Sequence, residues 1–194
     1  MQYFEESPKS ISKEKKIEVK IQNQNYTFIT DNGVFSKRGV DFGTRSLLDS
    51  LDFSRLRNNI LDFGCGYGPI GIVIAKKTNA NVHMIDINNR SVNLAKKNAL
   101  LNKVDVKIYE SNIYENIQDK FDFIITNPPI RVGNEILYKI LIDAKKHLNK
   151  NGELWFVINK DQGAKTVMKR LEEFYTVTLM TKNKGFYIIK ALND

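Results

Sequence analysis

Cysteine and histidine are nearly absent from this sequence. Cys65 is the only cysteine among 194 residues, and His83 and His147 are the only histidines. A single cysteine excludes an internal disulfide and a cysteine-rich zinc site, and it fits a reducing compartment. His83 lies in an apolar run and His147 near the end of a predicted helix, so we expect structural roles for both. The sequence therefore predicts no metal site.

Long hydrophobic runs are also missing. The chain opens with MQYFEESPKSISKEKK, which lacks the apolar centre of a secretory signal. No later stretch approaches the roughly 18 apolar residues of a membrane span. There is no proline-rich linker, fixed-period repeat or low-complexity segment. We predict a soluble cytoplasmic protein with one domain over residues 1–194, in which residues 1–57 form an extension of the core at 58–194.

Positive charge is in excess. Lys and Arg total 30 against 22 Asp and Glu, which gives a net charge of +8 and favours a polyanionic partner such as nucleic acid. Part of this excess has another explanation. Three lysine pairs fall near the carboxyl ends of predicted helices, where they complement the helix dipoles: 76–77, 96–97 and 145–146. In a parallel α/β fold these ends face away from the ligand-binding edge, so we do not count the pairs among the residues that could contact a nucleic acid.

Hydrophobic periodicity predicts an α/β fold. Residues 17–30 alternate around an Asn/Gln turn and predict a hairpin, followed by a glycine-containing loop and a helix near residues 44–51. From residue 58, short apolar runs alternate with helical segments, which predicts a mostly parallel, doubly wound sheet covered on both faces. The predicted strands are 59–63, 82–87, 106–111, 121–127 and 153–159, and the predicted helices after them start at 69, 90, 135 and 164. The end of the chain predicts a second hairpin, so one strand of the sheet should be antiparallel.

Three glycines on alternate positions follow the first of these strands, in ILDFGCGYGPI at residues 60–70. Gly64, Gly66 and Gly68 allow the backbone to pass close to a ligand, and Pro69 suits a helix start. The spacing differs from the dinucleotide fingerprint G-x-G-x-x-G. Asp86 ends the second strand, 18 residues beyond Gly68, near the separation of about 20 expected for a carboxylate that accepts from ribose hydroxyls. Together these features predict a cofactor that contains a nucleoside.

The fourth strand ends in Asn127-Pro128-Pro129-Ile130. Two prolines remove two backbone donors and stiffen the chain, so that carbonyl groups point in fixed directions. The side-chain oxygen of Asn127 and the carbonyl of Pro128 are then placed to accept both hydrogens of a planar amino group. This arrangement predicts that the protein holds an exocyclic or amide nitrogen toward an electrophile.

These motifs resemble those of class I methyltransferases that use S-adenosylmethionine and act on amino groups. With GVFSKRGVDFGTR at residues 33–45 and NPPIRVG at 127–133, the chain resembles small-subunit ribosomal RNA guanine-N2 methyltransferases and their single-domain relatives. The resemblance implies a Rossmann-like fold, S-adenosyl-L-methionine as cofactor, and ribosomal RNA or the small ribosomal subunit as partner. Because NPP also occurs in DNA adenine and protein glutamine methyltransferases, these substrates remain alternatives.

The resemblance assigns roles to particular residues. The catalytic residues are Asn127, Pro128, Pro129 and Ile130. The residues expected at the cofactor are Asp62, Gly64, Cys65, Gly66, Gly68, Asp86, Ile87, Asn112, Ile113 and Asn127. The residues expected to bind substrate follow from their position instead, because their loops should open on the catalytic face: Phe35, Lys37, Arg38, Arg131, Lys160, Lys182 and Lys184.

Two positions depart from the pattern of such enzymes. Many of them place an aromatic residue after the two prolines, where this chain has Ile130, and an Asp after the third strand, where it has Asn112. The expected reaction is in-line methyl transfer catalysed by positioning, without a general base. Asp41 is a candidate proton acceptor, but we expect it to be structural, and Phe42 either covers the ligand or anchors its loop. Two other classes stay open: a nicotinamide-dependent oxidoreductase, which NPPI does not suit, and a noncatalytic RNA-binding module.

Overall fold

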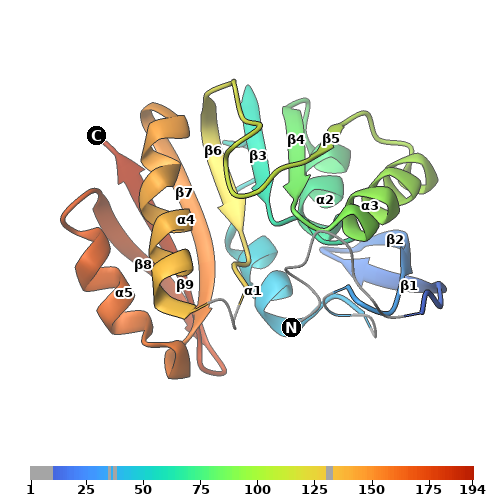
Figure 1. The fold of residues 1–194 in the computed structure, drawn as a ribbon, viewed down its shortest axis with the longest axis horizontal. Helices are drawn as coiled ribbons and strands as arrows, with labels where there is room; N and C mark the ends of the chain where they lie inside the picture. The colour runs from blue at the N-terminus through green and yellow to red at the C-terminus, as the bar shows by residue number, and fades with distance from the viewer. Residues whose placement is uncertain (1–10, 35, 37–38, 130–132) are drawn as a thin grey trace.

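A twisted, mostly parallel sheet forms the centre of the computed structural model, which describes residues 11–34, 36, 39–129 and 133–194. The strand order is β5-β4-β3-β6-β7-β9-β8. The strands are β3 (Asn59–Phe63), β4 (Asn81–Asp86), β5 (Lys107–Glu110), β6 (Phe121–Thr126), β7 (Leu148–Asn159), β8 (Thr176–Asn183) and β9 (Phe186–Asn193). The first five are parallel, and β9 runs antiparallel to both β7 and β8. The predicted fold class is therefore confirmed (Figure 1).

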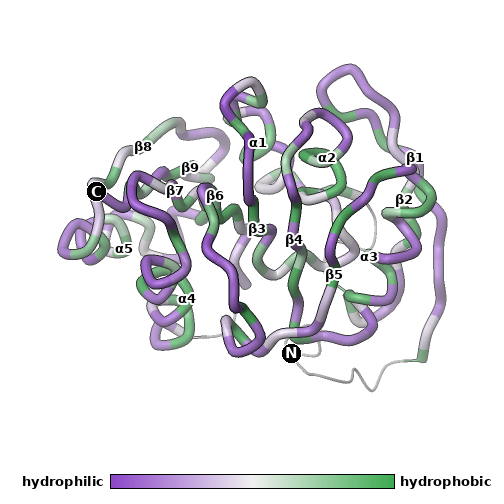
Figure 2. Tube along the Cα trace, turned by 90° about the horizontal axis from the view of Figure 1, so that it is seen from above, coloured by the Kyte–Doolittle hydropathy of each residue, from purple (hydrophilic) through white to green (hydrophobic). Residues whose placement is uncertain are grey.

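Helices cover both faces of the sheet. They are α1 (Phe42–Ser50), α2 (Pro69–Lys77), α3 (Asn89–Asn102), α4 (Gly133–His147) and α5 (Ala164–Leu171). Successive strand residues point to opposite faces: Ile60 packs in one apolar cluster with α1, α2 and α3, while Leu61 packs in a second cluster with α4 and α5. In Figure 1, α4 and α5 lie in front of the β7–β9 end of the sheet. Figure 2 shows α2 as a largely hydrophobic segment, as its position against the sheet requires.

The switch in strand order lies between β3 and β6. From β3 the chain proceeds outward through β4 to β5, and it then returns to β6 on the other side of β3 and continues to β7. Ligands of such sheets bind at the carboxyl ends of the strands beside this switch. The segments found there are the glycine loop after β3 and the Asn-Pro-Pro segment after β6.

The predicted N-terminal hairpin is present as β1 (Lys15–Ile21) and β2 (Gln24–Thr30), and it does not join the central sheet. Two buried asparagines of α3 attach it. Asn98 accepts from the amide of Ile29 at 2.6 Å and donates to its carbonyl at 2.9 Å, and Asn102 makes the same pair of bonds with Thr27 at 3.3 and 2.7 Å. Four residues of helix rise about 6 Å and two residues of strand about 6.8 Å, so the two spacings match. The helix thus presents two side chains where a third strand would present its backbone.

Several details differ from the sequence prediction. Lys96 and Lys97 lie in the middle of α3, because that helix continues to Asn102; the other two lysine pairs are in the last turns of α2 and α4, as predicted. β7 begins at Leu148, five residues before the predicted start at 153. No helix among the described residues is long and apolar enough to cross a membrane.

Candidate active site

The glycine loop lies directly above the carboxyl end of β3. Gly64, Gly66 and Gly68 all have positive φ angles, of 68°, 56° and 98°. A Cβ at Gly64 or Gly66 would meet no atom within 4 Å, whereas one at Gly68 would approach Ile72 and Met84 at 2.9 Å. Gly68 is therefore needed for packing, and the space above Gly64 and Gly66 is open to a ligand.

Asp86 closes one side of this loop. Its carboxylate accepts from the amide of Gly66 at 2.8 Å and from the amide of Asn88 at 2.9 Å. Burial raises the pKa of Asp86 to about 6, even though backbone hydrogen bonds oppose the shift. The predicted pairing of glycine loop and strand-end carboxylate is thus present in the geometry. Lone pairs of the carboxylate that these amides do not use can accept from hydroxyl groups of a ligand.

The segment after β5 lies beside Asp86 at the same edge of the sheet. The amide of Ser111 donates to the carbonyl of Asp86 at 3.0 Å, which holds this segment beside β4. Asn112 is exposed, and its amide nitrogen donates to Glu115 at 3.0 Å, so its oxygen is turned away from Glu115. Ile113 has a φ of 53°, a strained backbone conformation for a β-branched residue. Ile87, half-buried, follows Asp86 directly.

Two residues predicted at the cofactor turn their side chains elsewhere. Asp62 is fully buried and accepts from the amide of Gly71 at 2.8 Å, so its carboxyl group supports the first turn of α2 rather than facing the open loop. Burial raises the pKa of Asp62 to about 7, and the nearby Asp86 adds to the shift. Cys65 packs in the apolar core, and burial raises the pKa of its thiol. Only the backbone of Cys65 is available to a ligand, because its side chain is buried.

Asn127 stands at the carboxyl end of β6 with its amide group in a defined orientation. Its nitrogen donates to the carboxylate of Asp41 at 3.2 Å and to the hydroxyl of Thr44 at 3.0 Å. Asp41 also caps α1 by accepting from the amide of Thr44 at 3.0 Å, which confirms the structural role expected for it. Within the described part of the chain, no hydrogen bond to the Asn127 oxygen is present. The anchored nitrogen therefore leaves the oxygen to accept from a ligand.

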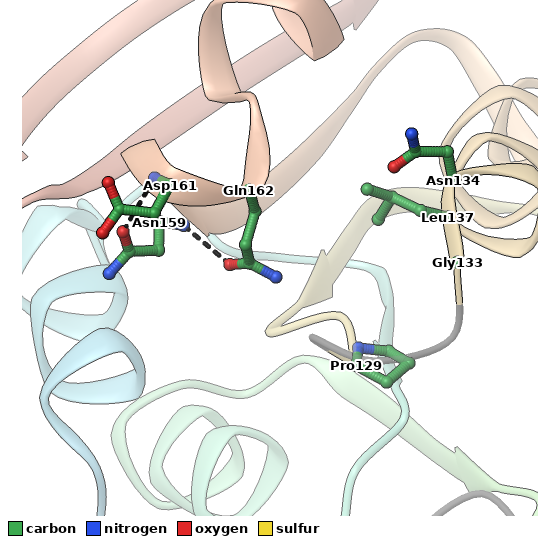
Figure 3. Close-up of a pocket in the computed structure, with 7 residues that line it drawn as sticks. All are labelled: Pro129, Gly133, Asn134, Leu137, Asn159, Asp161 and Gln162. Carbon is green, nitrogen blue, oxygen red and sulfur yellow. Dashed lines mark hydrogen bonds between the residues drawn. The ribbon is translucent and has the colours of Figure 1, made fainter.

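A pocket of about 450 Å³ adjoins this segment, and Figure 3 shows the side chains around it. Pro129 forms one side, and the first turns of α4 form a second. The third side is the end of β7 with the short 3₁₀ helix η2 (Lys160–Gln162). Among the residues that the structure describes, those lining the pocket are Pro129, Gly133, Asn134, Leu137, Asn159, Asp161 and Gln162.

Three of the predicted basic residues gather near the same edge. The amide of Lys160 donates to the carbonyl of Gly185 at 2.7 Å, which places the β8–β9 turn beside η2. Lys184 lies 5.1 Å from the ring centroid of Phe42 at the start of α1, and Lys182 lies 4.9 Å from that of Tyr187. Phe42 also packs on Phe186, so it anchors its loop to the sheet.

Five predicted site residues lie outside the described residues: Phe35, Lys37, Arg38, Ile130 and Arg131. The sequence interpretation missed Thr44 as an anchor for Asn127, as well as the pocket residues Asn159 and Gln162. Thr44 stands in an ordinary helix start and carried no motif, but Asn159 and Gln162 have the spacing of a capping box. No group of three or more His, Cys, Asp or Glu that could hold a metal occurs among the residues described.

Known proteins are similar to this chain in both sequence and fold. A relative from Bacillus subtilis (strain 168), "Uncharacterized protein YbxB", is 43% identical over 97% of this chain and 96% of its own length. "Ribosomal RNA small subunit methyltransferase C" of Haemophilus influenzae (strain Rd) is 34% identical over 86% of this chain, but the match spans only 52% of that enzyme.

One solved structure is especially similar. It is the T. thermophilus 16S rRNA N2 G1207 methyltransferase (RsmC) in complex with AdoMet and guanosine. Its TM-score is 0.85 at 25% identity, over 96% of this chain and 52% of that one. The match to the family described as methyltransferase small domain covers residues 25–190. The resemblance predicted from the glycine loop, Asp86 and NPPI is therefore confirmed, and the chain belongs to the methyltransferase small domain family.

Proposed function

We propose that the protein transfers a methyl group from S-adenosylmethionine to the exocyclic amino group, N2, of a guanine in ribosomal RNA. The observation that carries this proposal is the anchored amide of Asn127, whose nitrogen is held by Asp41 and Thr44 so that its oxygen can accept from an amino group. The names of two relatives support the substrate, since one is a small-subunit ribosomal RNA methyltransferase and the other an N2 guanine methyltransferase.

The residues around the glycine loop fit the cofactor. Asp86 would accept from ribose hydroxyls, and the open space over Gly64 and Gly66 would admit the amino-acid end of the molecule. Ile87 and Ile113 would supply apolar surface to the adenine, and the oxygen of Asn112 would accept from its amino group. When bound, S-adenosylmethionine supplies an electrophilic methyl group on a sulfonium.

Asn127 and Pro128 would act on the nucleophile. The lone pair of guanine N2 is delocalised into the ring, so the nitrogen is a weak nucleophile. The Asn127 oxygen and the Pro128 carbonyl each accept one hydrogen of N2, which fixes the orientation of the amino group and stabilises the positive charge that develops on it. After transfer the methylated nitrogen loses one proton to solvent, and the sulfonium has become a thioether. Lys160, Lys182 and Lys184 surround the same edge and contact RNA phosphates.

The first experiment identifies the substrate. The protein is incubated with methyl-labelled S-adenosylmethionine and, separately, with ribosomal RNA, ribosomal subunits, DNA and total protein, and labelled nucleic acid is digested to nucleosides. We expect label in RNA or the small subunit as N2-methylguanosine. Label in protein or in adenine of DNA would replace the proposal with one of the two alternatives that NPP allows.

A second experiment tests Asn127. In single-turnover reactions with saturating ligands, Asn127→Ala should lower the rate by about 10²- to 10³-fold, the usual effect of losing one positioned hydrogen-bonding group where charge develops. Asn149→Ala is a matched control, because Asn149 donates to Asp122 at the opposite end of β6 and β7. Melting temperature and cofactor affinity are measured for both variants. A folded, cofactor-binding Asn127→Ala variant that reacts at the parent rate contradicts the proposed role.

A further inference from the structure

The pocket beside Pro129 has the construction of a base-binding site. Pro129 and the buried Leu137 present apolar surface from two sides, and polar groups stand at the β7 side. Figure 3 shows Gln162 reaching from this side toward Pro129 across the opening. A flat, apolar ring with polar atoms on its edge fits such a space. Since Pro129 is two residues from Asn127, a base in the pocket lies next to the acceptors that hold its amino group.

The amide of Gln162 has a fixed direction. Its oxygen accepts from the backbone amide of Asn159 at 2.9 Å, and in return the side-chain oxygen of Asn159 accepts from Asp161 at 3.0 Å. This reciprocal capping box engages the oxygen of Gln162. The nitrogen of the same amide therefore faces the pocket, where it can only donate. Figure 3 shows this nitrogen on the side of the amide that faces Pro129.

A donor at this position distinguishes purines. Along the edge of guanine, the amino group at C2 is followed by N1–H and then by O6, a strong acceptor. When the amino group of adenine takes the place of N2, the third position along the edge is C2–H, which accepts nothing. We propose that Gln162 selects guanine by donating a hydrogen bond to O6 of the target base. The inference rests on the proposed function and extends it from the reacting nitrogen to the opposite end of the base edge.

Nucleoside binding tests the inference without turnover. In 2,6-diaminopurine riboside, an amino donor replaces O6 and N1 carries no hydrogen, while the C2 amino group remains. The part of the preference that depends on O6 is therefore the part that changes between the parent protein and a Gln162 variant. With S-adenosylhomocysteine present, calorimetry should show that the parent protein prefers guanosine to this analogue by roughly tenfold or more. Gln162→Glu keeps an oxygen for the amide of Asn159 but presents an acceptor to the pocket. This variant should lose the preference or reverse it.

The matched control is Gln118→Glu, which makes the same charge change at an exposed position before β6. It should keep the parent preference. An unchanged ratio in Gln162→Glu overturns the inference, as does failure of the parent protein to bind guanosine at millimolar concentration. If the variant does not fold, the parent protein alone decides: 6-thioguanosine, whose sulfur is a poor acceptor, must bind more weakly than guanosine. Failure of the proposed function is separate, because it appears as absence of N2-methylguanosine in the RNA assay.

Discussion

Asp86 offers the sharpest test of the cofactor site. Its carboxylate already accepts from the amides of Gly66 and Asn88, at 2.8 and 2.9 Å. A ribose bound over the loop would add hydroxyl donors to the same group. Asp86→Ala removes all these acceptors at once, whereas Asp86→Asn keeps one oxygen and replaces the other with a donor. The two variants therefore separate the loss of charge from the loss of the whole group.

The expected magnitude follows from the charge on the acceptor. A hydrogen bond to a charged group contributes about 1.5–3 kcal/mol, so Asp86→Ala should raise the Kd for S-adenosylhomocysteine by roughly 10- to 150-fold. The pKa of Asp86, raised by burial to about 6, adds a second signature. Below that pH the group is protonated and accepts less well from hydroxyls, so affinity should rise as pH increases from 5 to 7. Asp86→Asn has no proton to lose at this position, and its affinity should depend less on pH.

Isothermal titration calorimetry at several pH values measures both effects. Glu110→Ala is the control, because Glu110 pairs with Asp86 in register at the end of β5 but is exposed. It should bind like the parent protein. A parent-like Kd for a folded Asp86→Ala variant would remove this carboxylate from the site. An Asp86→Asn variant with the full pH dependence of the parent would assign that dependence to another group.

Three further perturbations test the surrounding structure. The pKa of the buried Asp62 is raised from 3.8 to about 7, so between these pH values the folded state holds a proton that the unfolded state has released. The free energy of unfolding should therefore fall as pH rises through this range, by on the order of 4 kcal/mol. Urea denaturation of Asp62→Asn should show a weaker fall; an identical pH profile contradicts the assignment. Asn98→Ala leaves three backbone groups without their partner, namely the carbonyl of Tyr67, which is buried, and the amide and carbonyl of Ile29, which are part-buried. It should destabilise the protein by about 3 kcal/mol in the same assay, unlike Asn93→Ala at an exposed position of the same helix. Equal stabilities of the two variants would refute the docking role. Lys184→Glu should weaken RNA binding and reduce the slope of log affinity against log salt concentration by about 0.7 or more. Lys76→Glu is the control and should do neither, because Lys76 also lies over an aromatic ring but in the last turn of α2. The reverse result would mean that RNA binds the other end of the sheet.

The sequence allowed prediction of those parts of the molecule that depend on local pattern. Apolar periodicity located the strands and helices, and the rule that ligands bind at strand carboxyl ends brought Asp86 to the glycine loop, where it bonds the amide of Gly66. The orientation of Asn127 could not be predicted in this way. Its anchors, Asp41 and Thr44, are more than 80 residues away in the sequence and resemble any helix start. The burial of Asp62 could not be predicted either, because the sequence near the end of a strand does not show whether an Asp side chain faces a ligand or a helix.

The attachment of the hairpin also affects behaviour at high concentration. A two-stranded ribbon has two unpaired edges, and either can recruit a strand from another molecule. On β2, Asn98 and Asn102 occupy the backbone groups of Ile29 and Thr27 that such a strand would need. The other strand, β1, carries lysines, which disfavour close approach by mutual repulsion: Lys15, Lys16 and Lys20. The two edges are thus protected by different means, one by covering and one by charge, so the covered edge should resist self-association in high salt better than the charged one.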